Sequence, residues 1–125
     1  MLGVMVLAAG GVLASAGSAS AIVEPPAGGW DHTWSAYGAT VYVEEHDDII
    51  SLCDSSANGH AATARVEWLY PSGNAYWMVP AKGGNGTCST QKASTGANLP
   101  EGETIYLEFS GDGTNYRKVS FFNDH

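Results

Sequence analysis

The chain has 125 residues, of which 13 are acidic and 5 are basic, and its formal net charge is −8. This length corresponds to a single domain. The negative charge argues against sequence-independent binding to nucleic acid, which needs clustered Lys and Arg, and against docking on anionic membranes. Apolar residues make up 44% of the chain, enough for a hydrophobic core.

The first 21 residues have the pattern of a signal peptide. Leu2–Ala16 is an unbroken run of apolar and small residues, and Ala19 and Ala21 occupy the −3 and −1 positions of an A-x-A cleavage site. We expect cleavage after Ala21 and a secreted mature chain, residues 22–125. No Lys or Arg precedes the run, so either translation starts upstream or the amino terminus alone supplies the positive charge. The alternative is a buried or membrane-anchoring helix.

Cys53 and Cys88 are the only two cysteines. Because oxidising compartments favour pairing, export predicts a Cys53–Cys88 disulfide. A metal site or a reactive thiol is the alternative. Neither cysteine belongs to a C-x-x-C pair, and two thiols alone do not complete a tetrahedral zinc site.

Residues 22–36 are predicted to be an N-terminal arm, because Ile22–Gly29 contains two prolines and two glycines. Residues 37–125 are predicted to form the folded domain. Its segments alternate between apolar and polar residues, the pattern of half-buried strands. These segments span residues 39–44, 49–53, 61–69, 75–79, 104–109 and 116–122, and residues 87–92 offer a seventh strand.

Turn signals separate the predicted strands. Pro71–Asn74 predicts a hairpin between two of them, and Ser110–Gly113 predicts another. Asp54–Gly59 reads as a turn held by its Asp and Asn side chains, because Arg65 stands where a calcium loop needs its bidentate Glu. Residues 81–98 are rich in glycine and predicted to be mainly irregular. We therefore expect an all-β fold, a small antiparallel β-sandwich of six or seven strands, immunoglobulin-like or jelly-roll-like, with one disulfide. A small β-barrel is the alternative.

Chemical motifs are few. The histidines are expected to be exposed loop residues, because no H-x-H or H-x-x-x-H spacing joins any two of them on one ion. They are His32, His46, His60 and His125. The mature chain has no G-x-S-x-G motif and no phosphate-binding glycine loop. We therefore expect no catalytic residue, no metal and no cofactor.

Aromatic residues offer the functional lead. Alternation places Trp68 and Trp77 in the core and three tyrosines on the opposite faces. Tyr42, Tyr76 and Tyr106 are the candidate binding face, which could stack on sugars or dock a partner protein. In the alternative, the tyrosines only stabilise a solvated sheet face.

Trp30 and Trp34 form a second candidate, an aromatic pair near the mature N-terminus. The pair would either close one end of the core or be presented to a ligand.

The stretch from Ile49 to Ala62 carries a resemblance. It resembles small secreted actinobacterial proteins of uncharacterised function, in which a strand ends in Cys-Asp and is followed by a turn, Gly-His and another strand. Here these residues are Cys53-Asp54 and Gly59-His60, and the single later cysteine, Cys88, suits the same layout. Asn58 stands where aspartate is more usual. The resemblance implies secretion and a disulfide, and it implies no activity.

Three functional hypotheses follow. The preferred one is a secreted, non-enzymatic, monomeric module that binds an extracellular protein or glycan, with no role for nucleic acid or, after signal cleavage, for membranes. The second is an inhibitor of an extracellular hydrolase that presents the Pro80–Pro100 loop, braced by Cys88. The third is a small hydrolase that uses a pair of acidic residues.

Overall fold

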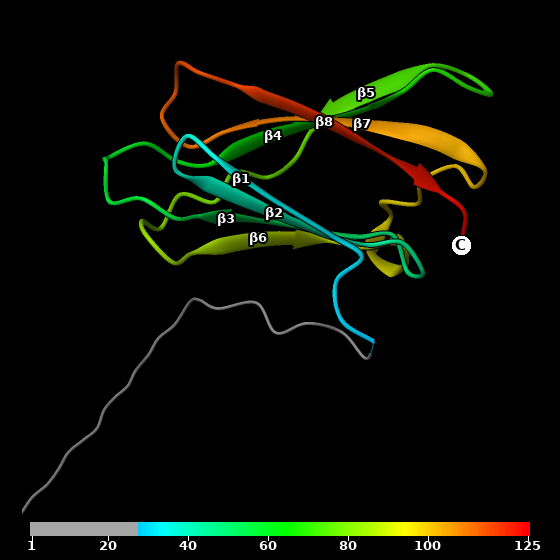
Figure 1. The fold of residues 1–125 in the computed structure, drawn as a ribbon, viewed down its shortest axis with the longest axis horizontal. Helices are drawn as coiled ribbons and strands as arrows, with labels where there is room; N and C mark the ends of the chain where they lie inside the picture. Colours follow the sequence, from blue (N-terminus) through cyan, green and yellow to red (C-terminus); the bar gives the residue numbers. More distant parts are fainter. Residues whose placement is uncertain (1–27) are drawn as a thin grey trace, which may run out of the picture.

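The computed structural model describes residues 28–125, which form two four-stranded antiparallel sheets stacked face to face (Figure 1). The expected signal peptide, residues 1–21, and residues 22–27 of the expected arm lie outside the described residues. Within the described part of the chain, no helix has the length and apolar character needed to cross a membrane.

The first sheet has the strand order β1-β2-β3-β6, and the second has the order β5-β4-β7-β8. One short 3-10 turn, η2 (Ala93–Thr95), follows β6. The strands are β1 (His32–Ala36), β2 (Ala39–Glu44), β3 (Ile49–Asp54), β4 (Thr63–Trp68), β5 (Asn74–Trp77), β6 (Cys88–Gln91), β7 (Glu103–Ser110) and β8 (Arg117–Asn123).

One apolar layer lies between the sheets. Alternate residues of β2, β3, β4 and β7 point into it, as period-two patterning requires. The same alternation leaves polar side chains on the outer faces. The central members of the layer are each at most 1% exposed: Val41, Val43, Ile50, Leu52, Val66, Ile105, Leu107 and Phe109.

The connections interlock the two sheets. The chain passes from β3 in the first sheet to β4 in the second, returns from β5 to β6, and passes again to the second sheet from β6 to β7; β3 pairs with β6 and β4 with β7. This is an immunoglobulin-like arrangement, with β1 added outside β2 and β5 at the edge beside β4. The predicted sandwich is confirmed. The barrel alternative is wrong, because no ladder joins the sheets in the described residues; Arg117 of β8 donates to the Ser35 carbonyl of β1 at 3.0 Å instead.

The predicted arm ends sooner than expected, because His32–Ala36 is strand β1 and brings the strands to eight. Its side chains alternate, with Trp34 and Ala36 packed against the core and Thr33 exposed. β1 turns into β2 through Tyr37 and Gly38, whose φ angles of 52° and 82° are both positive, as in the type I′ turns of tight hairpins.

That turn contacts the β7–β8 hairpin. The Gly111 N–H donates to the Tyr37 carbonyl at 2.9 Å, and a Cβ on Gly111 would lie only 2.3 Å from the Gly38 oxygen. Asn58 joins the same contact by donating to the Gly111 carbonyl at 2.8 Å, and its Oδ1 accepts the His60 N–H. The predicted Asx-type turn around Asn58 is therefore present, and it ties three loops together at this end of the sandwich.

The glycine-rich stretch 81–98 is less irregular than predicted. It contains β6, which lies within the 87–92 segment offered as a strand, and the η2 turn. The Pro80–Pro100 segment is thus not one free loop, because its middle is the edge strand of the first sheet.

The predicted disulfide is present. Cys53 of β3 and Cys88 of β6 lie directly opposite each other and are bonded, with an S–S distance of 2.04 Å. The neighbours Ile50 and Leu52 point into the core, so the disulfide lies on the outer side of the first sheet. It therefore joins two adjacent strands of one sheet rather than the two sheets.

Reduction of this bond is expected to destabilise the domain. The two cysteines are separated by 35 positions, and a cross-link of that span stabilises by about 4 kcal/mol on the chain-entropy account. Thermal unfolding followed by circular dichroism should show a Tm lower by about 15 °C or more in reductant. A Cys53→Ala/Cys88→Ala variant should match the reduced protein and not respond to reductant; an unchanged Tm in both cases would contradict the prediction.

Candidate functional site

The three tyrosines of the predicted binding face lie in three different places. Tyr42 is on the outer side of the first sheet, where its ring contacts Trp30 at a centroid distance of 5.4 Å. Tyr106 is on the outer side of the second sheet and is 42% exposed. Tyr76 points inward, because it pairs with the buried Val66. These tyrosines therefore do not form one face.

The error arises in β5. The prediction put Trp77 inward, but Trp77 lies opposite Arg65 and is 56% exposed. The length of the turn between β4 and β5 sets the hairpin register, and a shift of one residue exchanges the two faces. In the observed register Tyr76 and Met78 face the core, and Met78 is buried.

Trp30 and Trp34 do not form a pair. Trp30 lies against Tyr42 on the outer side of the first sheet. Trp34 faces the core side, where its ring stacks on His32 with a centroid distance of 5.2 Å and lies 6.5 Å from Phe121. Two roles were expected for the pair, and the first of them, closing one end of the core, fits Trp34, which packs against the core.

A groove lies between one edge strand of each sheet. Its walls come from β5, the edge of the second sheet, and from β6, the edge of the first, together with the connection that follows β6. Its volume is about 480 Å³, within the usual range of small-ligand sites. The residues that line it are Trp68, Asn74, Tyr76, Val79, Thr90, Gln91, Thr95, Gly96, Ala97 and Asn98.

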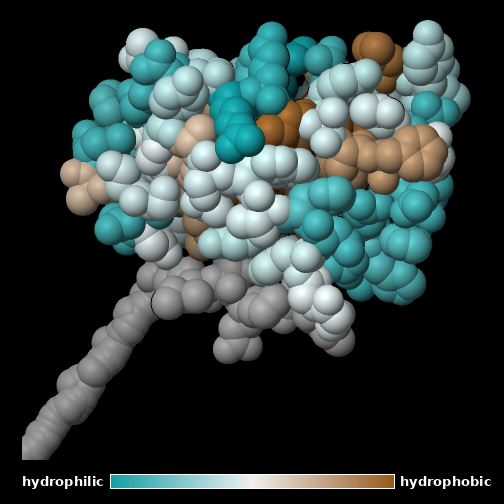
Figure 2. Space-filling view, viewed as in Figure 1, coloured by the Kyte–Doolittle hydropathy of each residue, from teal (hydrophilic) through white to brown (hydrophobic). Residues whose placement is uncertain are grey.

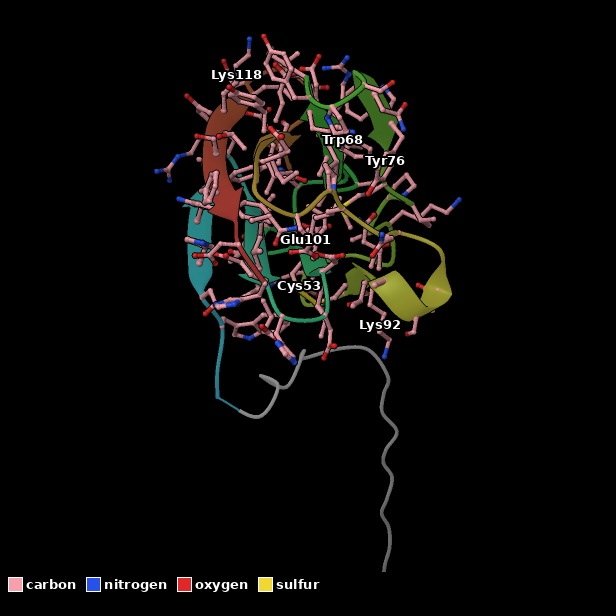
Figure 3. All side chains as sticks on the ribbon, turned by 90° about the vertical axis from the view of Figure 1, so that its right-hand side faces the viewer. Cys53, Trp68, Tyr76, Lys92, Glu101 and Lys118 are labelled. Carbon is pink, nitrogen blue, oxygen red and sulfur yellow. A yellow bond between two sulfur atoms is a disulfide. The ribbon has the colours of Figure 1, made fainter. Side chains whose placement is uncertain are left out.

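Two half-buried aromatic rings form the apolar part of this groove. Trp68 of β4 and Tyr76 of β5 meet edge to face, with centroids 6.2 Å apart and an interplanar angle of 77° (Figure 3). Both rings also pack against the core, which limits their movement. The groove therefore has a rigid aromatic element.

Gln91 and Tyr76 connect the two sheets across the groove. The Gln91 side-chain amide donates to the Tyr76 hydroxyl oxygen. Burial raises the pKa of Tyr76 above its ordinary value, so the hydroxyl stays protonated at neutral pH. Because the oxygen accepts from Gln91, the O–H of Tyr76 can still donate to a ligand.

The lining is uncharged, although the chain as a whole carries a net charge of −8. No Asp, Glu, Lys, Arg or His contributes to it. The polar groups are the amides of Asn74, Gln91 and Asn98, because the hydroxyls of Thr90 and Thr95 already pair with the Ser51 hydroxyl and with the Lys92 backbone. Each amide offers a donor and an acceptor, so the groove suits a neutral ligand with many hydroxyl groups.

The outer side of the second sheet is a different surface. Exposed aromatic side chains, Trp77, Tyr106 and Phe122, stand on it. The same side has a hollow of about 220 Å³ that is lined by Tyr106 and by two ion pairs, Arg65–Glu67 at 3.2 Å and Lys118–Glu108 at 3.5 Å. The hollow is less than half as large as the groove, and each of its two carboxylates already has a basic partner.

Acidic groups gather at the end of the sandwich where β2 turns into β3 and β8 ends. Asp48 is 3% exposed and accepts from the Leu99 N–H at 3.0 Å and from the Asn123 amide at 3.1 Å. The pKa of Glu101, an exposed residue, is raised by partial desolvation and by the negative charge of Asp48. His125 lowers this pKa, and Asp124 raises it further. The hydrophilic area at the lower right of Figure 2 corresponds to this end.

The raised pKa of Glu101 predicts a pH-dependent stability. A carboxyl whose pKa is higher in the folded protein than in the unfolded chain destabilises the folded state once it ionises. This destabilisation is absent at low pH and present at neutral pH. Glu101→Gln should therefore raise the Tm at pH 7 by about 2 °C and leave it unchanged at pH 3. Glu108→Gln, which removes the ion pair with Lys118, is the control and should not raise the Tm. A lower Tm of Glu101→Gln at pH 7 would refute the prediction.

No known protein family, curated protein or solved structure matches this chain.

Proposed function

We propose that the protein is a secreted, non-enzymatic module that binds a neutral glycan in the groove between β5 and β6. The observation that carries the proposal is the lining, which combines two aromatic rings with three side-chain amides and has no carboxylate, ammonium or guanidinium group. An acidic chain that bound a charged partner would be expected to bring charge to the site.

The chemistry of the lining matches that of a sugar. The C–H face of a pyranose ring is apolar and can lie on an aromatic ring such as Trp68, whose large surface is already ordered by its contact with Tyr76. The hydroxyls on the rim of the sugar both donate and accept, as do the amides of Asn74 and Asn98. The O–H of Tyr76 adds one more donor.

Export is part of the proposal. The apolar N-terminal run with its A-x-A site predicts secretion, and the Cys53–Cys88 disulfide is compatible with an oxidising compartment. Soluble extracellular glycans and cell-wall polysaccharides are found in that compartment.

Binding should depend on the amides of the groove. Asn74→Ala/Asn98→Ala removes two donor–acceptor groups from exposed positions, so the fold should be kept while affinity for a neutral oligosaccharide falls by about tenfold or more. The measurement is a screen of the oxidised protein on an array of neutral and charged glycans, followed by titration calorimetry with the best neutral oligosaccharide.

Trp77→Ala is the matched control, because Trp77 is equally aromatic but stands on the outer side of the second sheet. It should leave glycan affinity unchanged. The proposal fails if no neutral glycan binds, if only charged glycans bind, or if Trp77→Ala abolishes binding while the amide variant does not. Capture of an extended peptide that adds to the open edge of β5 or β6 would point to protein recognition instead.

The export part has its own test. Expression with the native N-terminus, followed by intact mass analysis of the culture supernatant without reductant, should give residues 22–125 lighter by the mass of two hydrogens. Reduction should restore those two hydrogens. Retention of residues 1–21 or free thiols in the secreted chain would be incompatible with this part of the proposal.

A further inference from the structure

Three of the four histidines come together at the acidic end of the sandwich. His32 begins β1, His46 follows β2 and His125 follows β8, and in the sequence these residues are far apart. The His46 and His125 rings lie with their centroids 6.4 Å apart. Figure 1 places the C-terminus beside the turn between β2 and β3.

Two carboxylates stand beside His125. One ligand atom each from Glu45, Asp124 and His125 can be chosen so that all three atoms lie within 4.8 Å of one another. The His125 Nε2 is 3.4 Å from an oxygen of Asp124, and the Asp124 N–H donates to Oε1 of Glu45 at 3.4 Å. The three groups are therefore close enough to one another to hold one ion.

Glu45 is a built part of this cluster rather than a mobile surface acid. Its side chain is nine-tenths buried, and its Oε2 lies 2.6 Å from Nε2 of His32. Its backbone N–H donates to Asp31 at 2.8 Å. Metal-binding side chains are commonly held by such outer hydrogen bonds, which orient them before the ion arrives.

The electrostatics also favour a cation. Glu45 and Asp124 are among the charges that raise the pKa of Glu101, whereas none of the ion pairs in the described residues brings a Lys or Arg to Glu45 or Asp124. A divalent ion would offset this concentration of negative charge.

We propose that Glu45, Asp124 and His125 bind one divalent transition-metal ion, best matched by Zn²⁺, with the fourth coordination position left to water. A set of imidazole nitrogens and carboxylate oxygens suits Zn²⁺, whereas Mg²⁺ and Ca²⁺ prefer oxygen ligands alone. No metal was expected from the sequence, because no two histidines have the short spacing of a local metal-binding motif. Here the proposed ligands come from segments that are far apart in the sequence. The site lies apart from the groove between β5 and β6, because none of its residues lines that groove.

Titration calorimetry of the purified, oxidised chain with ZnCl₂ tests the site. The expected result is saturable binding of one ion per chain, weakened by about tenfold or more in His125→Ala and in Asp124→Asn, with much weaker binding of MgCl₂. Both substitutions are at exposed residues beyond the last strand, so circular dichroism should show an unchanged fold.

His60→Ala is the control, because His60 is also exposed but contacts Gly113 at the other end of the sandwich. It should bind Zn²⁺ as the parent does. Absence of saturable binding, or equal loss in His60→Ala and His125→Ala, would overturn the assignment. Visible absorption of the Co²⁺-loaded protein gives a second readout, since loss of its tetrahedral bands in His125→Ala supports the site and their retention refutes it.

Discussion

The burial of one layer of apolar side chains between two sheets determines where every other surface of the molecule lies. The interior side chains of β2 and β3 meet those of β4 and β7, and the chain crosses between the sheets from β3 to β4, from β5 to β6 and from β6 to β7. The crossing from β5 to β6 joins the two edge strands that border the groove. The groove therefore follows from the topology. The residues that line it are only partly buried or exposed.

Much of this fold could be predicted from alternation alone. Residues such as Val41 and Leu107 lie in long, regular patterns, and the Pro71–Asn74 and Ser110–Gly113 turns mark the β4–β5 and β7–β8 hairpins. The edge strands β1 and β6 were harder to recognise. The residues of β6 on the interior side are Ser89 and Gln91, because this strand borders a groove rather than the core. Its sequence therefore lacks apolar residues at every second position. The sequence therefore offers a strand at residues 87–92 only as an option within a stretch predicted to be mainly irregular.

The candidate functional surfaces depend on three-dimensional contacts that the sequence pattern alone does not contain. In β5, Tyr76 and Trp77 are adjacent, so either register puts one large aromatic ring inward, and the turn before the strand decides between them. The histidine and carboxylate cluster depends on the β2–β3 turn and the end of β8 meeting in space. Only Trp68, whose inward direction was predicted correctly, belongs to both the expected core and the observed groove.

The position of the disulfide has a consequence for the groove. β6 is a four-residue edge strand with no strand beyond it in the described residues, and Cys88 anchors it to the well-buried β3. Gln91, three residues further on, is the residue that reaches Tyr76 across the groove. A chain with its sulfurs reduced would keep its hydrophobic interior and yet lose the alignment of one wall. The bond between Cys53 and Cys88 thus fixes the position of β6 and, through it, one wall of the groove.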